Sequence, residues 1–144
     1  MKRRVLLVLA VVGALVACTP QPAGPKVLNR EATAEDKLPE YVTLSEGFDV
    51  RSARLLVEHD GVRYFAVKGN ETSYACLAVV ADDMPDWVAG CGGAGRGTDI
   101  VTVSSSPLRI EAKFINDGVD TTRPEYQGLT KIHDNVLISQ PSRY

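Results

Sequence analysis

The chain has 144 residues, the length of one domain. Hydrophobic residues make up 44% of it and charged residues 24%, which excludes a wholly disordered chain. The formal net charge is −2, without the basic excess of nucleic-acid-binding domains, so we expect no nucleic acid partner.

The N-terminal segment has the pattern of a secretion signal. Basic residues at positions 2–4 precede an unbroken apolar run of 13 residues over 5–17. A transmembrane helix needs about 20 apolar residues, whereas the apolar part of a signal peptide has about 7–15. The run ends in Leu15-Val16-Ala17-Cys18.

This segment resembles the lipobox signal peptide of bacterial lipoproteins, in which Leu and two small or apolar residues precede a cysteine. The resemblance implies that residues 1–17 are a signal peptide, that the Cys18 thiol receives a diacylglyceryl group, and that cleavage occurs before Cys18, often followed by N-acylation. It also implies a location on the extracytoplasmic face of the cell membrane, with the membrane as partner through the lipid anchor at Cys18. The alternatives are an ordinary secretory signal and an uncleaved anchor.

Removal of the signal makes the chain more acidic. Three of the 16 basic residues lie at positions 2–4, so 13 remain against 18 acidic residues, a net charge of −5. A negative domain is not drawn electrostatically to anionic lipid, so membrane attachment depends on the acyl chains.

The segment after the signal has little capacity for regular structure. Three prolines and one glycine within 19–25 exclude a helix or a paired strand there, and residues 26–40 stay polar. We therefore predict the lipidated Cys18 and a disordered tether over 18–40, followed by a globular β domain over 41–144.

From about residue 41 the chain alternates short apolar runs with turn signals. The runs cover 54–59, 62–68, 73–81, 87–91, 100–104 and 108–114, with a last hairpin within 129–139. Asp60-Gly61 is a strong hairpin signal, because a type I′ turn needs positive φ at both central residues. The spacing predicts a mainly β fold, as a small antiparallel sheet, sandwich or open barrel with at most one or two short helices. One such helix is predicted near 48–55, with Asp49 as its N-cap.

The cysteine count fits this organisation. The chain has three cysteines, and lipidation of Cys18 leaves Cys76 and Cys91 as a pair. Outside the cytoplasm such a pair is expected to form a disulfide. The alternative, a metal site with two cysteines, lacks a CxxC spacing and has no histidine nearby in the sequence.

Residues 54–139 also resemble a loose group of small actinobacterial secreted proteins and lipoproteins. The likeness rests on the segments HDGVRYFAV, CLAVV followed by WVAGC, INDG and DNVLIS. It implies a disulfide-stapled extracytoplasmic domain and brings no activity with it.

Candidate chemistry is sparse. The glycine loop over 92–97 lacks the Lys and Ser or Thr of a phosphate-binding loop and precedes a strand, so we interpret it as a strand connection. His59 and His133 are 74 positions apart, each beside an aspartate at a predicted strand end. The acidic residues within 82–86 favour a solvated turn over a calcium site. Trp87, beside the predicted disulfide, is interpreted as a core residue, with an exposed binding aromatic as the alternative.

These observations predict a cell-envelope lipoprotein without cofactor, metal site or catalytic residues. Its most favoured role is a non-catalytic binding or interaction module, with an envelope protein as possible partner. The alternatives are an envelope enzyme, such as a hydrolase built around His59 or His133, an inhibitor of an envelope enzyme, and a purely structural protein.

Overall fold

The computed structural model describes residues 24–83, 85–95 and 99–139. Over these residues the chain forms eight strands and three short 3-10 turns. The strands are β1 (Phe48–His59), β2 (Val62–Gly69), β3 (Tyr74–Ala81), β4 (Trp87–Gly93), β5 (Asp99–Ser105), β6 (Ile110–Ile115), β7 (Leu129–His133) and β8 (Val136–Ser139). The turns are η1 (Lys26–Asn29), η2 (Ala34–Asp36) and η3 (Pro124–Tyr126).

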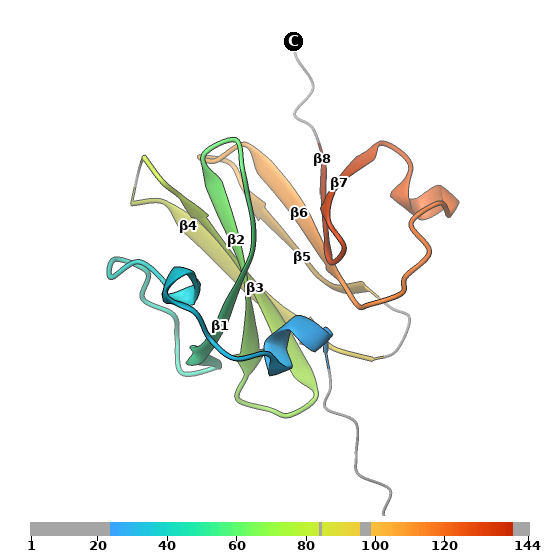
Figure 1. Ribbon diagram of the computed structural model, residues 1–144. Helices are drawn as coiled ribbons and strands as arrows, with labels where there is room; N and C mark the ends of the chain where they lie inside the picture. Colours follow the sequence, from blue (N-terminus) through green and yellow to red (C-terminus); the bar gives the residue numbers. More distant parts are fainter. Residues whose placement is uncertain (1–23, 84, 96–98, 140–144) are drawn as a thin grey trace, which may run out of the picture.

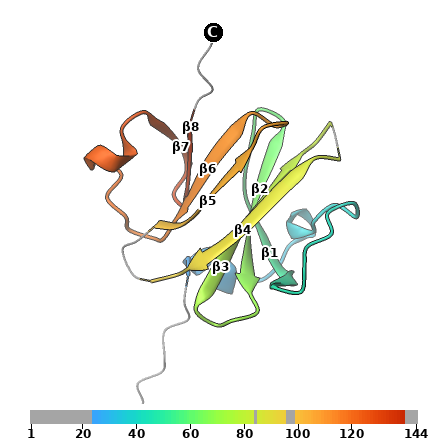
Figure 2. The same ribbon diagram turned by 180° about the vertical axis from the view of Figure 1, so that it is seen from behind.

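The strands form two antiparallel four-stranded sheets within the described ranges, which confirms the predicted mainly β fold. The first sheet has the order β1-β2-β3-β4 and the second the order β5-β6-β8-β7. The two sheets lie against each other, with β4 crossing beside β5 (Figures 1 and 2). Among the described residues no helix is long and apolar enough to cross a membrane.

Both predicted hairpins are present. Asp60 and Gly61 join β1 to β2 with φ of 50° and 74°, as a type I′ turn requires. The last hairpin pairs β7 with β8 around Asp134 and Asn135. The predicted strand over 108–114 begins two residues later, because Arg109 has a φ of 52° and its N–H donates to the Ser106 carbonyl in a turn.

The main core lies between the two sheets. It joins side chains of the first sheet, such as Tyr64, Leu77 and Val79, to Phe114 and Val136 of the second. The outer face of the first sheet is also covered, by apolar side chains within 38–48. Strand β3 is therefore buried on both faces after its first residue, which explains its continuous apolar sequence.

Glycines of β4 allow the two sheets to approach closely. A Cβ atom at Gly92 would lie 1.7 Å from the Ile100 carbonyl oxygen, and one at Gly90 would lie 2.9 Å from a Val103 methyl group. The first part of the predicted glycine loop thus belongs to β4, where only glycine fits against β5.

Residues 24–40 contradict the predicted tether. They pack along the domain as a segment that we call the N-terminal strap (Figure 1). Leu28 is buried in the main core, and Leu38 packs on the outer face of the first sheet. The low apolar content of this segment suggested disorder, but a few buried side chains are enough to hold the strap on the domain. The globular unit therefore includes residues 24–40, while residues 1–17 and Cys18 lie outside the described ranges.

The helix predicted near 48–55 is wrong, because these residues form the first part of β1. Asp49 pairs with Lys68 of β2 and Arg54 with Ala66, so residues 50–53 bulge out of the ladder. The Asp49 carboxylate does accept the Arg51 N–H, as a local cap would, but pairing with β2 decides the outcome.

Candidate functional site

A groove of about 560 Å³ lies between the strap and the bulge of β1. It exists because residues 50–53 leave the β1–β2 ladder while the chain over 32–42 passes beside them. Its lining residues are Ala32, Thr33, Asp36, Lys37, Leu38, Pro39, Glu40, Val42, Val50, Arg51 and Ala53.

The walls of the groove are largely apolar and its rim is charged. Leu38, Val42 and Ala53 belong to the apolar cluster on the outer face of the first sheet. Val50 remains 49% exposed, which is high for a large apolar residue. The rim carries charges of both signs, and the Arg51 side chain is 93% exposed. This arrangement can hold an apolar side chain and leaves a polar flank in water.

An ion pair fixes the strap wall of the groove. The Asp36 residue is 3% exposed, and its carboxylate accepts two hydrogen bonds of 2.6 Å from the Arg30 guanidinium. It also accepts the N–H of Thr33 and the N–H of Leu55, each at 2.7 Å. The hydrogen bonds from Arg30 hold the pKa of the Asp36 carboxyl well below its usual range.

The same pair covers the edge of the first sheet. Strand β1 is outermost in that sheet, so its outward backbone groups need partners. Asp36 accepts the Leu55 N–H, and Arg30 donates to the Leu55 carbonyl at 3.4 Å. In return, the Arg54 guanidinium donates to the Arg30 carbonyl at 2.9 Å. Side chains of the strap thus take the place of a neighbouring strand at this point.

The two predicted candidate histidines lie at the ends of different strands. His59 ends β1, with its Nε2 atom 3.4 Å from the Asp60 carboxylate. His133 ends β7, and its Nδ1 atom accepts the Asn135 N–H. Burial lowers the pKa of His133, which favours the neutral imidazole. In the described part of the chain, neither histidine is hydrogen-bonded to a serine or cysteine side chain.

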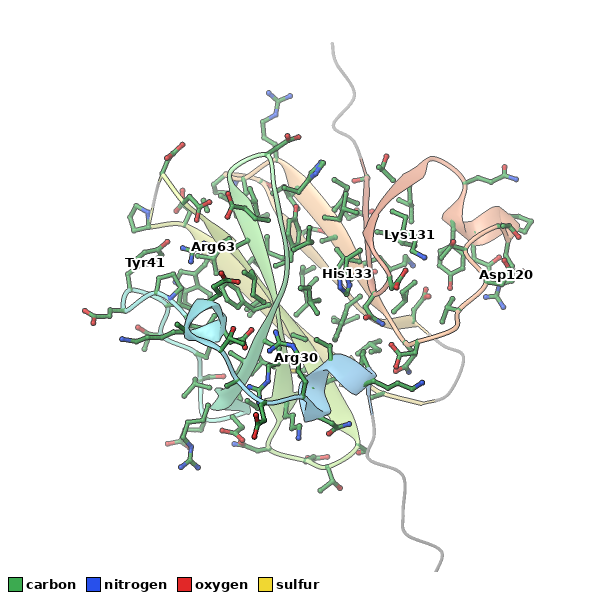
Figure 3. The ribbon with its side chains drawn as sticks, viewed as in Figure 1. Arg30, Tyr41, Arg63, Asp120, Lys131 and His133 are labelled. Atoms are coloured by element: carbon green, nitrogen blue, oxygen red, sulfur yellow. A yellow bond between two sulfur atoms is a disulfide. The ribbon has the colours of Figure 1, made fainter. Side chains whose placement is uncertain are left out.

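Figure 3 shows Arg30 beside η1 and β1, with His133 of β7 above it in this view. Neither His59 nor His133 lines the groove, and neither is a hydrogen-bond partner of Asp36.

The predicted acidic turn is tied to the domain by its first residue. The Asp82 carboxylate accepts a hydrogen bond of 2.5 Å from Arg63, while Asp83 is exposed. Among the described residues, no three His, Cys, Asp or Glu side chains gather as metal ligands would. Trp87 is partly buried and packs against the outer apolar cluster of the first sheet.

The predicted disulfide between Cys76 and Cys91 is present. The two residues lie directly opposite each other on β3 and β4, with their Cα atoms 4.0 Å apart. The bond joins the central strand of the first sheet to an edge strand, on the face that the chain over 38–48 covers.

Sequence reasoning missed Arg30 and Asp36. The one local signal is the spacing of Thr33 and Asp36, which form a reciprocal capping box around η2. That signal predicts a turn, but nothing near it in sequence predicts the contact of Asp36 with Leu55.

Comparison of the chain with protein-family models, with curated proteins and with solved structures gave no match. The fold and the groove define the class of protein directly: a disulfide-bonded antiparallel β sandwich with a strap along one sheet edge.

Proposed function

We propose that this chain is a lipid-anchored domain on the extracytoplasmic face of the cell membrane, and that it binds another envelope component without catalysing a reaction. The basic segment, apolar run and Leu15-Val16-Ala17-Cys18 support the anchoring. The disulfide between Cys76 and Cys91 supports an oxidising compartment.

The groove beside the β1 bulge is the observation that carries the binding role. Its lining combines apolar walls, an exposed Val50 and charged groups on the rim. An envelope protein that presents an apolar side chain flanked by polar residues matches this lining. The ion pair of Arg30 with Asp36 keeps the strap wall in place before the partner arrives, so little ordering is needed on binding.

Site-specific photo-crosslinking in the native envelope tests this role. A photoreactive residue at Glu40, which lies on the rim, should form an adduct of defined mass. Val50→Arg should abolish the adduct, because it places a charge in the apolar groove. Thr102→Arg, on an exposed position of β5, is the matched control and should leave the adduct unchanged. An adduct that persists in Val50→Arg would remove the groove from consideration as the binding site.

A further inference from the structure

We propose that the domain lies on the membrane with one defined end, the end that carries Tyr74, against the lipid headgroups. This inference rests on the proposed anchoring at Cys18. It adds an interaction surface whose partner is the lipid bilayer itself.

The length of chain between Cys18 and the fold limits how the domain can lie relative to the membrane. Gly24, the first residue that the structure describes, packs on the domain as part of the strap and lies six positions after Cys18. Six residues span at most about 20–22 Å when fully extended, at roughly 3.3–3.6 Å per residue. A domain of about 100 residues has a radius of gyration near 13 Å, which corresponds to a globule about 35 Å across. The anchor is therefore too short for the end far from Gly24 to reach the membrane.

The surroundings of Gly24 define which end faces the lipid. A Cβ atom at Gly24 would contact Leu28 of η1, Ala75 of β3 and Ala94 after β4. Ala75 is the second residue of β3, and Ala94 follows the last residue of β4. The start of η1 and the connection between β2 and β3 lie at the same end of the molecule (Figure 1).

Tyr74 gives this end a side chain suited to the membrane interface. It is the first residue of β3, lies beside Gly69 of β2, and is 43% exposed. Tyrosine rings concentrate at headgroup depth in membrane proteins, because the ring is apolar and the hydroxyl is polar. By contrast, the hydroxyl of the other exposed tyrosine in the described ranges, Tyr41, donates to the Ala81 carbonyl at the opposite end of β3.

Charges at this end do not select for anionic lipid. Exposed or half-exposed groups of both signs lie there, from Lys26 and Lys68 to Glu71 and Asp117. We therefore expect the contact to form on zwitterionic bilayers and to withstand added salt, since tether length and Tyr74 produce it.

Trp87 provides a built-in reference for the test. In the β3–β4 register Tyr74 lies opposite Gly93, whereas Trp87 lies opposite Val80. Six residues along a strand correspond to about 20 Å. Trp87 is thus placed about 20 Å farther from the proposed membrane contact than Tyr74.

The experiment uses the full lipidated protein in phosphatidylcholine vesicles that contain a headgroup nitroxide quencher. Two proteins are compared: the natural chain, which reports from Trp87, and the double variant Trp87→Phe/Tyr74→Trp. The indole introduced at position 74 should lose fluorescence as the quencher content rises, whereas Trp87 should keep its fluorescence. Thermal unfolding of the soluble forms verifies that the double variant is folded. If it is not, the single variant Tyr74→Trp replaces it, and the quenching at position 74 is obtained by subtracting the fluorescence of the natural chain.

Vesicle flotation separates the two proposals. A natural chain that fails to float, like a Cys18→Ser control, would overturn the anchoring and with it the orientation. A chain that floats but shows equal quenching at both positions, or stronger quenching of Trp87, would overturn the orientation alone.

Discussion

Asp36→Ala is expected to destabilise the domain strongly, because the strap depends on that carboxylate. Its removal leaves the Leu55 N–H without its acceptor, at a cost of about 1–3 kcal/mol, and removes the η2 cap, at a cost of about 1 kcal/mol. The Arg30 side chain is 37% exposed and can rehydrate, so the lost ion pair adds only about 0–1 kcal/mol. The total, about 2–5 kcal/mol, corresponds to a decrease in melting temperature of roughly 10–20 °C.

Thermal unfolding followed by circular dichroism measures this effect. Glu35→Ala is the matched control, because Glu35 is the exposed neighbour within η2. A surface substitution of that kind usually changes stability by less than about 0.5 kcal/mol. If both variants melted within a few degrees of the natural chain, the strap would not be held by Asp36, and residues 24–40 would behave as the tether first predicted.

The pH dependence of stability tests the ion pair of Arg30 with Asp36 independently. The Arg30 hydrogen bonds lower the pKa of folded Asp36 below the value of about 3.9 expected in the unfolded chain. The contribution of Asp36 to stability is therefore complete above that unfolded pKa and is lost as the pH falls toward the folded pKa. Between about pH 5 and pH 2, the natural chain should lose stability more steeply than Asp36→Asn. Equal slopes would contradict the ion pair.

Three further experiments test other parts of the molecule. Cys18→Ser should abolish labelling of the protein by an alkyne fatty acid, and equal labelling of both proteins would refute lipidation at this residue. The double variant Cys76→Ala/Cys91→Ala removes a disulfide with a sequence separation of 15. Its free energy of unfolding should be lower by about 3 kcal/mol, and its melting temperature should therefore fall by more than about 10 °C. Intact mass before and after reduction verifies the bond in the natural chain. Gly92→Ala should destabilise by about 1–3 kcal/mol or more through its clash with the β5 backbone, whereas Gly93→Ala, with open space around it, should be nearly neutral. Similar chemical denaturation midpoints for the two glycine variants would exclude the close approach of β4 to β5.

The sequence predicts this fold well wherever a local signal decides the structure. Asp60-Gly61 specifies its turn through backbone conformation, and the flanking apolar runs can pair with each other across it. The disulfide was predictable for a similar reason, since Cys76 and Cys91 lie on adjacent runs joined by one turn.

The sequence fails where a distant partner decides the structure. The strap looks like a linker because its composition is mostly polar, yet Asp36 bonds to a backbone group 19 positions away. The stretch 48–55 carries a local helix signal at Asp49, but β2 offers a ladder that a helix could not use. The groove depends on both features, so no pattern within either segment could predict it.

The packing of the strap on the domain also affects how far from the membrane a partner of the groove would be bound. Asp49 of β1 lies opposite Lys68, which in turn pairs with Ala75 beside Tyr74, so the bulge of β1 is near the end proposed to face the lipid. A tether of 22 residues would have allowed the domain to present the groove at many heights and angles. Under the proposed anchoring at Cys18, an anchor that reaches only about 20 Å would hold the bulge side of the groove close to the bilayer instead. The two proposals together therefore predict a partner that is bound to the membrane or reaches down to it, and they disfavour a freely diffusing protein large enough to be blocked by the headgroups.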